Sequence, residues 1–411
     1  MTHRNLYRTL ATAALALPLL SLLPACGSLS GQQTQKQEQH NRWNQTRIGV
    51  LYQLAQQQYQ VGDYDKARAT LRQAFALNYP HAATHVLAAK VEIEKGGLQV
   101  AADHLKTAIQ IDANYVEAYY LQGVVYQRWQ NNQAAHDYYK IAWEKKPNEA
   151  LFLLALVEMK IALNQQDDAR KLLEEKLVYF EQTAAVRAAL ARLYALAGDH
   201  AQAVTFYRAA SLLSPEDLTL RQNFAEELYF AGRYSECLPI LEDLAKNPAA
   251  EDRASVRTVL GKTYIALRRP RDARSIFAEI TRDDPNDNLA WLELGRATLQ
   301  LEDYQQAASV AQRVLKIEPR NLDALILLSL CQHKQKQWDS ARTTLAKAHD
   351  VAPTNPTVLC LMGVTAQNLG QKEQAVDFYA EALKLKPSDP WAEELLATAK
   401  PGAAVPAPRG Q

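Results

Sequence analysis

Apolar and polar positions repeat along this chain with a period of 34 residues, interrupted once by a step of 36. The ten copies begin at residues 48, 82, 116, 150, 184, 218, 254, 288, 322 and 356. Position 20 of the copy is Ala in nine cases and Cys in the tenth. These residues are Ala67, Ala101, Ala135, Ala169, Ala203, Cys237, Ala273, Ala307, Ala341 and Ala375. A fixed period of this length is typical of stacked helix pairs, in which each copy packs on its neighbours.

Other positions of the copy predict how each helix pair is built. Position 8 is Gly, Ala or Ser except for Val157 in the fourth copy, and a small residue there lets two helices approach closely. Position 24 is bulky in nearly every copy, as at Leu71, Tyr139 and Phe277, and is expected to fill space between copies. A Gly or polar residue marks a turn near position 15, and Pro at position 32 ends the second helix in six copies. The pattern predicts antiparallel helical hairpins.

This pattern resembles the tetratricopeptide repeat family over residues 48–389. The copy that carries the resemblance most clearly contains Trp291, Leu294, Gly295, Tyr304, Ala307, Val314 and Pro319. The resemblance implies an all-α, right-handed superhelical solenoid of about ten helix-turn-helix repeats. Residues 390–400 are predicted to form a helix that caps the open end of the stack. Residues 401–411 are rich in Pro, Ala and Gly, which predicts a disordered tail.

The N-terminus carries a second pattern. Arg4 and Arg8 precede an apolar run over residues 10–23, and Cys26 follows shortly after it. The run is short for a membrane span, which needs about 20 apolar residues. Residues 1–25 therefore resemble a bacterial lipoprotein signal peptide, and the resemblance implies that Cys26 is lipidated. An uncleaved or ordinary signal peptide is the alternative.

The residues after Cys26 give an expected location. Residue 27 is Gly, and in such lipoproteins the absence of Asp at this position implies sorting to the outer membrane. The resemblance thus predicts a lipid-anchored protein that faces the periplasm of a Gram-negative bacterium. Residues 26–47 are Gln-rich and lack apolar periodicity, which predicts a flexible tether between the lipid and the first repeat.

Three further cysteines occur in the repeats. Cys237 and Cys331 stand at positions that the repeat normally buries, so both are interpreted as core residues. Cys331 and Cys360 are expected on neighbouring first helices, and the sequence leaves open whether a disulfide joins them. An odd number of cysteines in an oxidising compartment leaves at least one free thiol.

Motifs for catalysis, metals and nucleic acids are weak. Gly261, Lys262 and Thr263 imitate the end of a phosphate-binding loop, but no strand precedes them. His81 and His85 have the spacing of a metal-binding pair, but no Glu accompanies them in the required arrangement. Lys and Arg total 46 against 45 Asp and Glu, and no basic stripe persists between copies. We therefore expect no enzymatic activity, no cofactor, no metal and no nucleic-acid partner.

The resemblance also implies a binding surface, because positions 2, 5, 9, 12 and 13 of the first helices line a groove in this family. The candidate partner-binding residues are Tyr52, Tyr59, Lys90, Tyr120, Arg128, Arg192, Glu226, Lys262, Arg296 and Leu330. Lys262 and Arg296 are suited to hold a carboxylate of a partner peptide. The apolar stretch beyond them is suited to a helix or an extended segment. The alternative for each residue is an ordinary structural role in lining the repeats.

The function predicted from these observations is a scaffold for protein–protein interactions. It would be anchored in the bacterial envelope and recruit components of a secretion, pilus or polysaccharide-export assembly, as similar repeat lipoproteins do. A periplasmic holdase for exported proteins is the main alternative. An enzymatic site hidden in an atypical repeat and weak self-association are further alternatives. The carboxylate clamp of cytosolic chaperone cofactors is not reproduced, because Asn is missing from position 9 of every copy.

Overall fold

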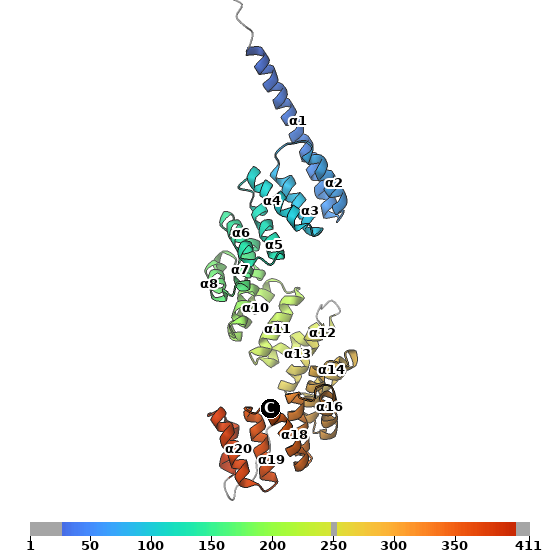
Figure 1. The fold of residues 1–411 in the computed structure, drawn as a ribbon, viewed down its shortest axis with the longest axis vertical. Helices are drawn as coiled ribbons and strands as arrows, with labels where there is room; N and C mark the ends of the chain where they lie inside the picture. The colour runs from blue at the N-terminus through green and yellow to red at the C-terminus, as the bar shows by residue number, and fades with distance from the viewer. Residues whose placement is uncertain (1–26, 248–252, 400–411) are drawn as a thin grey trace, which may run out of the picture. The chain divides into compact units, whose positions relative to one another are not determined.

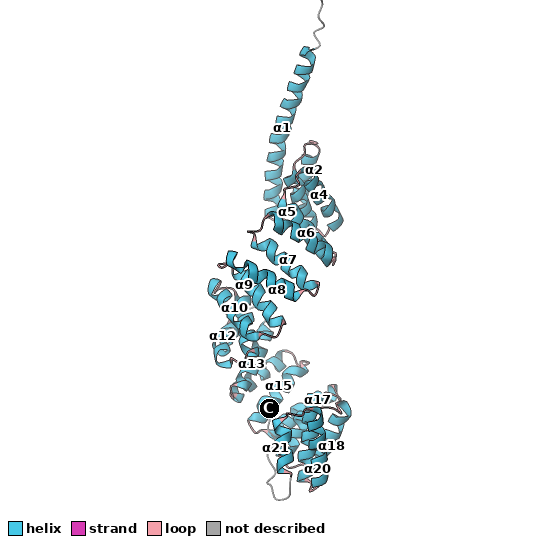
Figure 2. Ribbon diagram, turned by 90° about the vertical axis from the view of Figure 1, so that its left-hand side faces the viewer, coloured by secondary structure: helices cyan, strands magenta, loops and turns pink. Residues whose placement is uncertain are grey.

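The computed structural model of this protein describes residues 27–247 and 253–399. Their secondary structure consists of helices and short turns, with no strand in either range (Figures 1 and 2). The all-α solenoid class predicted from the 34-residue period is confirmed. The chain divides into two compact units, Met1–Leu163 and Asn164–Gln411, and the boundary falls inside the fourth copy.

The first unit is formed by consecutive pairs of helices. Its helices within the described residues are α1 (Gly27–Gln60), α2 (Tyr64–Phe75), α3 (Ala82–Glu94), α4 (Leu98–Ile111), α5 (Val116–Arg128), α6 (Asn132–Lys145) and α7 (Ala150–Ala162). In the first three copies, the first helix packs against the second helix of its own copy: α1 on α2, α3 on α4 and α5 on α6. Each second helix also packs on the first helix that follows, which builds a continuous stack within the unit.

The second unit continues the same alternation. Its described helices are α8 (Gln166–Lys176), η1 (Leu177–Tyr179), α9 (Ala184–Leu196), α10 (His200–Leu213), α11 (Leu218–Phe230), α12 (Tyr234–Lys246), α13 (Arg253–Ala266), α14 (Pro270–Asp283), α15 (Asn288–Gln300), α16 (Tyr304–Ile317), α17 (Leu322–Lys334), α18 (Trp338–Val351), α19 (Pro356–Asn368), α20 (Lys372–Leu385) and α21 (Pro390–Thr398). The last helix, α21, packs on α20 and on α19. It thereby covers apolar surface at the end of the last full copy.

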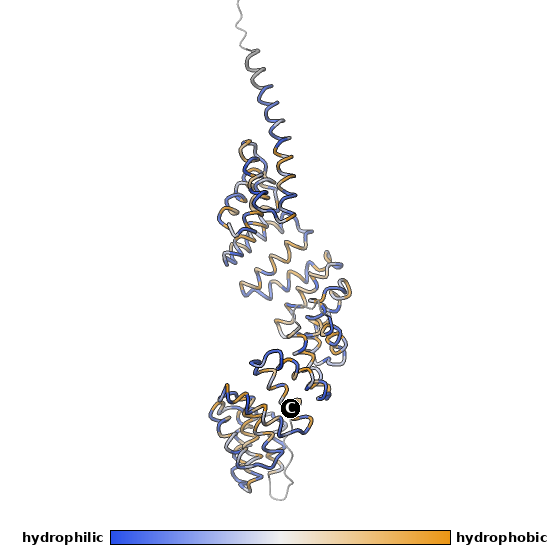
Figure 3. Tube along the Cα trace, turned by 90° about the vertical axis from the view of Figure 1, so that its right-hand side faces the viewer, coloured by the Kyte–Doolittle hydropathy of each residue, from blue (hydrophilic) through white to orange (hydrophobic). Residues whose placement is uncertain are grey.

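Helix α1 corrects one prediction. The Gln-rich composition predicts a flexible tether over residues 26–47, but α1 runs unbroken from Gly27 to Gln60. Gln, Glu, Lys and Arg are good helix formers and no proline occurs between Pro24 and Pro80, so the first repeat helix extends toward the N-terminus. Figure 3 shows the extension as mainly hydrophilic. From residue 35 on, the first buried side chains of α1 are those of Asn44 and Ile48, where the helix meets the repeats.

The two helices of each copy are joined at position 15 by a residue in the left-handed backbone region. Its φ lies between +57° and +82° in all ten copies. These residues are Gly62, Gly96, Gln130, Asn164, Gly198, Gly232, Arg268, Glu302, Lys336 and Gly370. Left-handed backbone costs a residue with a side chain about 1 kcal/mol or more, whereas glycine adopts it freely. The hairpin geometry therefore imposes this conformation even where the sequence does not supply glycine.

Short polar side chains begin many of the second helices. The carboxylate of Asp199 accepts a hydrogen bond from the backbone N–H of Gln202 at 3.0 Å, and Asp303 caps α16 in the same way at 3.1 Å. Asn131 caps α6 at 3.1 Å. Each cap satisfies a backbone donor that has no partner inside the helix, which stabilises the helix start by about 1 kcal/mol.

Position 20 and the contact of position 8 with position 24 show how tightly the helix pairs pack. Every residue at position 20 is fully buried, from Ala67 to Ala375. A Cβ atom on Gly261 would lie 2.6 Å from the ring of Phe277, the residue at position 24 of the same copy. The same pairing of glycine with an aromatic ring recurs at Gly123 and in the last copy. In these three copies the aromatic residue at position 24 packs on the glycine of its own copy, while Leu71 at position 24 of the first copy shares a core cluster with Leu87 and Val91 of the second.

Substitution of Gly261 by Ala tests this packing. Gly261→Ala is expected to lower the free energy of unfolding by about 1–3 kcal/mol, because the added methyl group collides with the buried Phe277 ring. Gly49→Ala is the matched control: nothing lies within 4 Å of a Cβ there, so Ala should raise stability by up to about 1 kcal/mol through its helix propensity. Urea unfolding followed by circular dichroism measures both variants. Changes of the same sign would contradict the packing described.

Candidate peptide-binding groove

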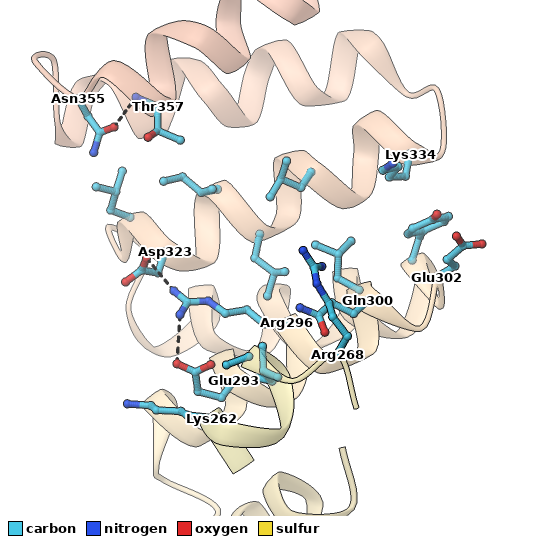
Figure 4. A pocket seen from close by; sticks show the side chains of 18 of the residues that line it. Lys262, Arg268, Glu293, Arg296, Gln300, Glu302, Asp323, Lys334, Asn355 and Thr357 are labelled. Atoms are coloured by element: carbon cyan, nitrogen blue, oxygen red, sulfur yellow. Dashed lines mark hydrogen bonds and ion pairs between the residues drawn. The ribbon is translucent and has the colours of Figure 1, made fainter. Parts of the chain in front are cut away.

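A groove with a volume of about 790 Å³ lies in the second unit. Its walls come mainly from three successive first helices, α13, α15 and α17, and the start of α19 closes one side (Figure 4). Lys262, Arg296 and Leu330 line it and occupy position 9 of copies seven, eight and nine. The 34-residue register brings these three predicted residues together because equivalent positions of stacked helices share one face.

Part of the groove lining is an apolar strip formed by α15 and α17. Leu299, Ile326 and Leu330 are half-buried and line the groove together with the buried Leu327. Half-buried aliphatic side chains leave apolar surface in contact with water, and covering such surface stabilises a complex by about 25 cal/mol for each Å² removed from water. The strip is therefore suited to contact apolar side chains of a partner.

Arg296 is held by two carboxylates at one side of the groove. Its Nη1 lies 3.1 Å from Oε1 of Glu293, and its Nη2 lies 3.1 Å from Oδ1 of Asp323 (Figure 4). The side chain of Glu293 is only 7% exposed, so its charge depends on Arg296 for compensation. The expected clamp of Lys262 and Arg296 on a partner carboxylate is therefore modified, because such a carboxylate must compete with Glu293 and Asp323 for Arg296.

Three other cationic side chains in the groove are unpaired. Lys262, Arg268 and Lys334 have no ion-pair or side-chain hydrogen-bond partner within residues 27–247 and 253–399. Figure 4 shows Lys262 and Lys334 at opposite ends of the view. Arg268 and the acidic Glu302 are left-handed turn residues with φ of +57° and +64°. This turn conformation occurs at position 15 of every copy, and in copies seven and eight it places these two charged side chains at the groove.

Two predicted groove residues of the second unit lie outside this groove. Arg192 on α9 is exposed and does not line it. Glu226 on α11 accepts a hydrogen bond from Nε2 of Gln222 at 2.9 Å. That Arg192 and Glu226 contact a partner therefore stays a prediction.

In the first unit, the predicted residues Tyr52 and Tyr59 pack against neighbouring rings. The ring of Tyr52 lies 5.6 Å from that of His81, edge to face, and Tyr59 lies 5.6 Å from Tyr64. Burial raises the pKa of Tyr59, with nearby Glu94 contributing. Both tyrosines are half-buried, so each presents only part of its surface to a partner.

The remaining predicted residues of the first unit are engaged within the fold. Nζ of Lys90 lies 2.5 Å from the carboxylate of Glu117, and Nη1 of Arg128 donates to the backbone oxygen of Ile93 at 2.9 Å. Tyr120 is half-buried between two aromatic rings, with centroids 5.5 Å from that of Tyr139 and 5.3 Å from that of Phe152. These contacts favour structural roles for the three side chains, because a partner would have to displace existing interactions.

In the structure, His85 pairs with a different histidine from the one that the sequence spacing indicates. Nδ1 of His85 lies 3.2 Å from Nδ1 of His104, a residue that the i,i+4 spacing with His81 did not indicate. His81 instead lies 2.6 Å from the hydroxyl of Thr84. Burial, together with the neighbouring His104, lowers the pKa of His85 to about 4, so the ring is neutral near pH 7. No group of three or more potential metal ligands occurs among the residues described.

The three cysteines of the repeats are buried free thiols in the structure. No bond joins Cys331 on α17 to Cys360 on α19. Burial raises the pKa of each of these two thiols to about 12, which keeps them protonated and unreactive near pH 7. Cys237 donates a hydrogen bond to the backbone oxygen of Ala225 at 3.2 Å.

The predicted signal peptide over residues 1–25, the lipidation site Cys26 and the tail over residues 401–411 lie outside the described residues. Within the described part of the chain, none of the helices combines the length and the apolar character that crossing a bilayer requires.

Three segments match family models of this repeat type. Residues 280–391 match the tetratricopeptide repeat domain of cytochrome c-type biogenesis protein H, and residues 52–116 and 186–220 match two general tetratricopeptide repeat models. The chain is built from tetratricopeptide repeats. The match over residues 280–391 covers α15 to α20 and thus most of the residues that line the groove.

Solved structures with a similar fold belong to several systems. The Cut9–Hcn1 hetero-tetramer of APC/C is 14% identical over 90% of this chain and 95% of its own, with a TM-score of 0.45. A tetratricopeptide repeat protein from Parabacteroides merdae is 17% identical over 62% and 99%, with a TM-score of 0.44. MamA from Desulfovibrio magneticus is 19% identical over 43% and 98%, with a TM-score of 0.38. No curated protein sequence matches the chain.

The role of Arg296 is testable through stability. Arg296→Met is expected to lower the free energy of unfolding by about 1–2 kcal/mol, because it leaves the buried carboxylate of Glu293 without a partner; the solvent exposure of Arg296 keeps the loss below that of a fully buried pair. Adding Glu293→Gln should restore most of the loss. Lys334→Met is the control, since Lys334 has no ion pair among the described residues. A stable Arg296→Met variant in urea unfolding would refute the pairing.

Proposed function

We propose that this repeat protein is a non-enzymatic scaffold that binds a segment of a protein partner in the groove of its second unit. The observation that carries the proposal is the groove itself, where an apolar strip from successive first helices lies beside unpaired cations. Concave surfaces of this composition bind extended or helical peptides through apolar anchors and a few charged contacts. Apolar contacts supply affinity, and the charges select the partner.

The charges of the groove favour an acidic, apolar segment. Four cationic and three acidic side chains line it, and Arg296 is already neutralised by Glu293 and Asp323. The remaining unpaired charges are three cations and the carboxylate of Glu302. A partner segment with aliphatic side chains flanked by Asp or Glu would therefore complement the apolar strip and the free cations together.

One observation favours a more specific function, a role in cytochrome c biogenesis. The model that matches residues 280–391 describes the tetratricopeptide repeat domain of a cytochrome c-type biogenesis protein, and this segment supplies most of the groove. The bound partner would then be a component of that process. A secretion, pilus or polysaccharide-export assembly is the broader proposal, and a holdase for exported proteins is the alternative.

The same proposal includes a lipid anchor at Cys26, which would hold the protein at the outer membrane, facing the periplasm. Its support is the N-terminal sequence, in which basic residues and an apolar run precede Cys26. Acyl chains bind a bilayer with about 0.8 kcal/mol per buried CH2 group. Residues 27–43 of α1 have a length of about 25 Å and would act as a helical spacer between the anchor and the repeats.

Photo-crosslinking in cells tests the groove. A photoreactive amino acid in place of Leu330, in the apolar strip, is expected to capture one dominant protein partner. The same amino acid in place of Leu212, which is 77% exposed on α10 and outside the groove, is the control and should capture little. Mass spectrometry identifies the partner: a cytochrome c biogenesis component would support the specific candidate. Many unrelated exported proteins captured at Leu330 would favour the holdase and overturn the scaffold proposal.

Charge reversal tests whether the cations of the groove, rather than the net charge of the protein, attract the partner. Lys262→Glu with Lys334→Glu should reduce the crosslink yield at Leu330 by about five- to tenfold, because the variants repel an acidic partner. Lys316→Glu with Lys347→Glu makes the same change in net charge at exposed residues outside the groove and should leave the yield unchanged. Equal yields from the two double variants would contradict an electrostatic role of the groove.

The lipid anchor has a separate test. Cys26→Ser is expected to move the protein from the membrane fraction to the soluble fraction, because the acyl chains attach through the cysteine sulfur. Cell fractionation with immunoblotting measures the distribution, and Cys237→Ser serves as the control because Cys237 is buried in the repeats. Retention of the Cys26→Ser variant in the membrane fraction would exclude the lipid as the main anchor.

A further inference from the structure

A second cavity, with a volume of about 730 Å³, lies in the first unit between α4, α5 and α6. We call it the Tyr126 pocket. Its residues on α5 include Tyr119, Gln122 and Tyr126, which occupy positions 4, 7 and 11 of the third copy. None of the residues that line the groove of the second unit occupies position 4, 7 or 11 of its copy. The Tyr126 pocket therefore uses a different face of the first helix and is independent of the function proposed above.

Aromatic rings form one wall of the Tyr126 pocket. The ring of Tyr126 is stacked on that of Tyr138, with centroids 5.3 Å apart and planes 11° from parallel. Trp129 contacts Tyr126 edge to face at 5.4 Å and is 39% exposed at the rim. Rings arranged in this way offer electron-rich faces, which attract a cation placed over them.

An unpartnered buried oxygen provides a second, independent observation. Gln122 lines the pocket and is only 5% exposed. Its Oε1 atom is buried and has no hydrogen-bond partner. A buried acceptor without a donor is unfavourable, so a ligand that donates a hydrogen bond here is favoured. The carboxylates of Asp103 and Asp137 also line the pocket, and Lys106 is its one cationic lining residue.

A second copy of the same local arrangement shows which chemical group fits. Tyr194 also occupies position 11 and is also stacked on the residue at position 23, Phe206, with centroids 5.5 Å apart and planes 9° from parallel. There the guanidinium of Arg170 covers the tyrosine, with its Cζ atom 5.6 Å from the ring centroid. A third position-11 tyrosine, Tyr264, likewise carries the guanidinium of Arg269, at 4.6 Å.

The Tyr126 pocket has a small residue where the other copy has that arginine. Arg170 occupies position 21 of the copy before Tyr194, and the equivalent residue before Tyr126 is Ala102. Ala102 lines the pocket, so the space that Arg170 fills beside Tyr194 is open beside Tyr126. The neighbouring Arg128 does not fill it, because its guanidinium is bonded to the backbone oxygen of Ile93.

We propose that the Tyr126 pocket binds an arginine side chain of a partner protein. The guanidinium would lie over Tyr126 in the place that Arg170 takes beside Tyr194, and it would donate N–H groups to Oε1 of Gln122 and to the carboxylate of Asp103 or Asp137. A planar guanidinium with five donors meets these requirements, whereas an ammonium group does not stack as a plane. The Tyr126 pocket would thus recognise a basic residue, whereas the groove is proposed to bind an acidic segment.

Fluorine NMR of the full-length chain in detergent, labelled with 5-fluorotryptophan, tests the proposal. N-acetyl-arginine amide is expected to shift the resonance of Trp129, assigned with Trp129→Phe, in a saturable manner. The other five tryptophans serve as internal controls. N-acetyl-citrulline amide has nearly the same shape without the charge and should bind about tenfold more weakly. Equal binding of citrulline, or a saturable shift of Trp129 by maltose instead of arginine, would overturn the proposal.

A substitution that places an arginine of the chain itself in the Tyr126 pocket provides a second test. Ala102→Arg places an arginine where the other copy has Arg170 and should abolish the shift by N-acetyl-arginine amide. Val100→Arg is the control, because Val100 is 44% exposed on the same helix and does not line the pocket. If Ala102→Arg does not fold by circular dichroism, Gln122→Leu replaces it and should weaken binding about threefold or more, since one acceptor is lost. Unchanged binding in the folded variant would refute the site.

Discussion

The close approach of the two helices within each copy is the constraint on which the rest of the structure depends. All ten residues at position 20 are fully buried, and at Gly123, Gly261 and Gly363 an aromatic ring occupies the space of a side chain. Because the interior is filled to high density, even one added methyl group would be felt at these positions. The 34-residue register recurs along the chain, so successive first helices within a unit present equivalent positions on the same faces. Binding residues can then vary on those faces without disturbing the core.

The two cavities show how this regular scaffold produces different surfaces. In the second unit, equivalent positions of successive helices place Lys262, Arg296 and Leu330 along one groove. In the first unit, a single small residue, Ala102, opens a pocket over Tyr126 that Arg170 closes in a related copy. The groove therefore follows from stacking several copies, whereas the Tyr126 pocket follows from a change in one copy.

Electrostatic pairing decides which charged residues are available to a partner. Arg296 occupies position 9 and lines the groove, but its guanidinium is already paired with the carboxylates of Glu293 and Asp323. Lys90 is likewise paired with Glu117. Lys262, at the same repeat position as Arg296, has no such partner among the described residues. Residues with the same register position thus differ in function, because their neighbours come from the next helix and differ from copy to copy.

The sequence by itself determined the helical class, the register of the copies and the positions that share a face, because these depend on a local period of small and bulky residues. It also placed Lys262, Arg296 and Leu330 on one surface. Only the tertiary structure showed that α1 continues as a helix before residue 48, that His85 pairs with His104 and that Oε1 of Gln122 lacks a donor. The histidine pair and the unpartnered oxygen depend on side-chain directions and on neighbours from other helices, which a one-dimensional pattern does not contain. The extension of α1 agrees with the helix propensity of its Gln, Glu, Lys and Arg residues, but it lacks the apolar periodicity from which the other helices were predicted.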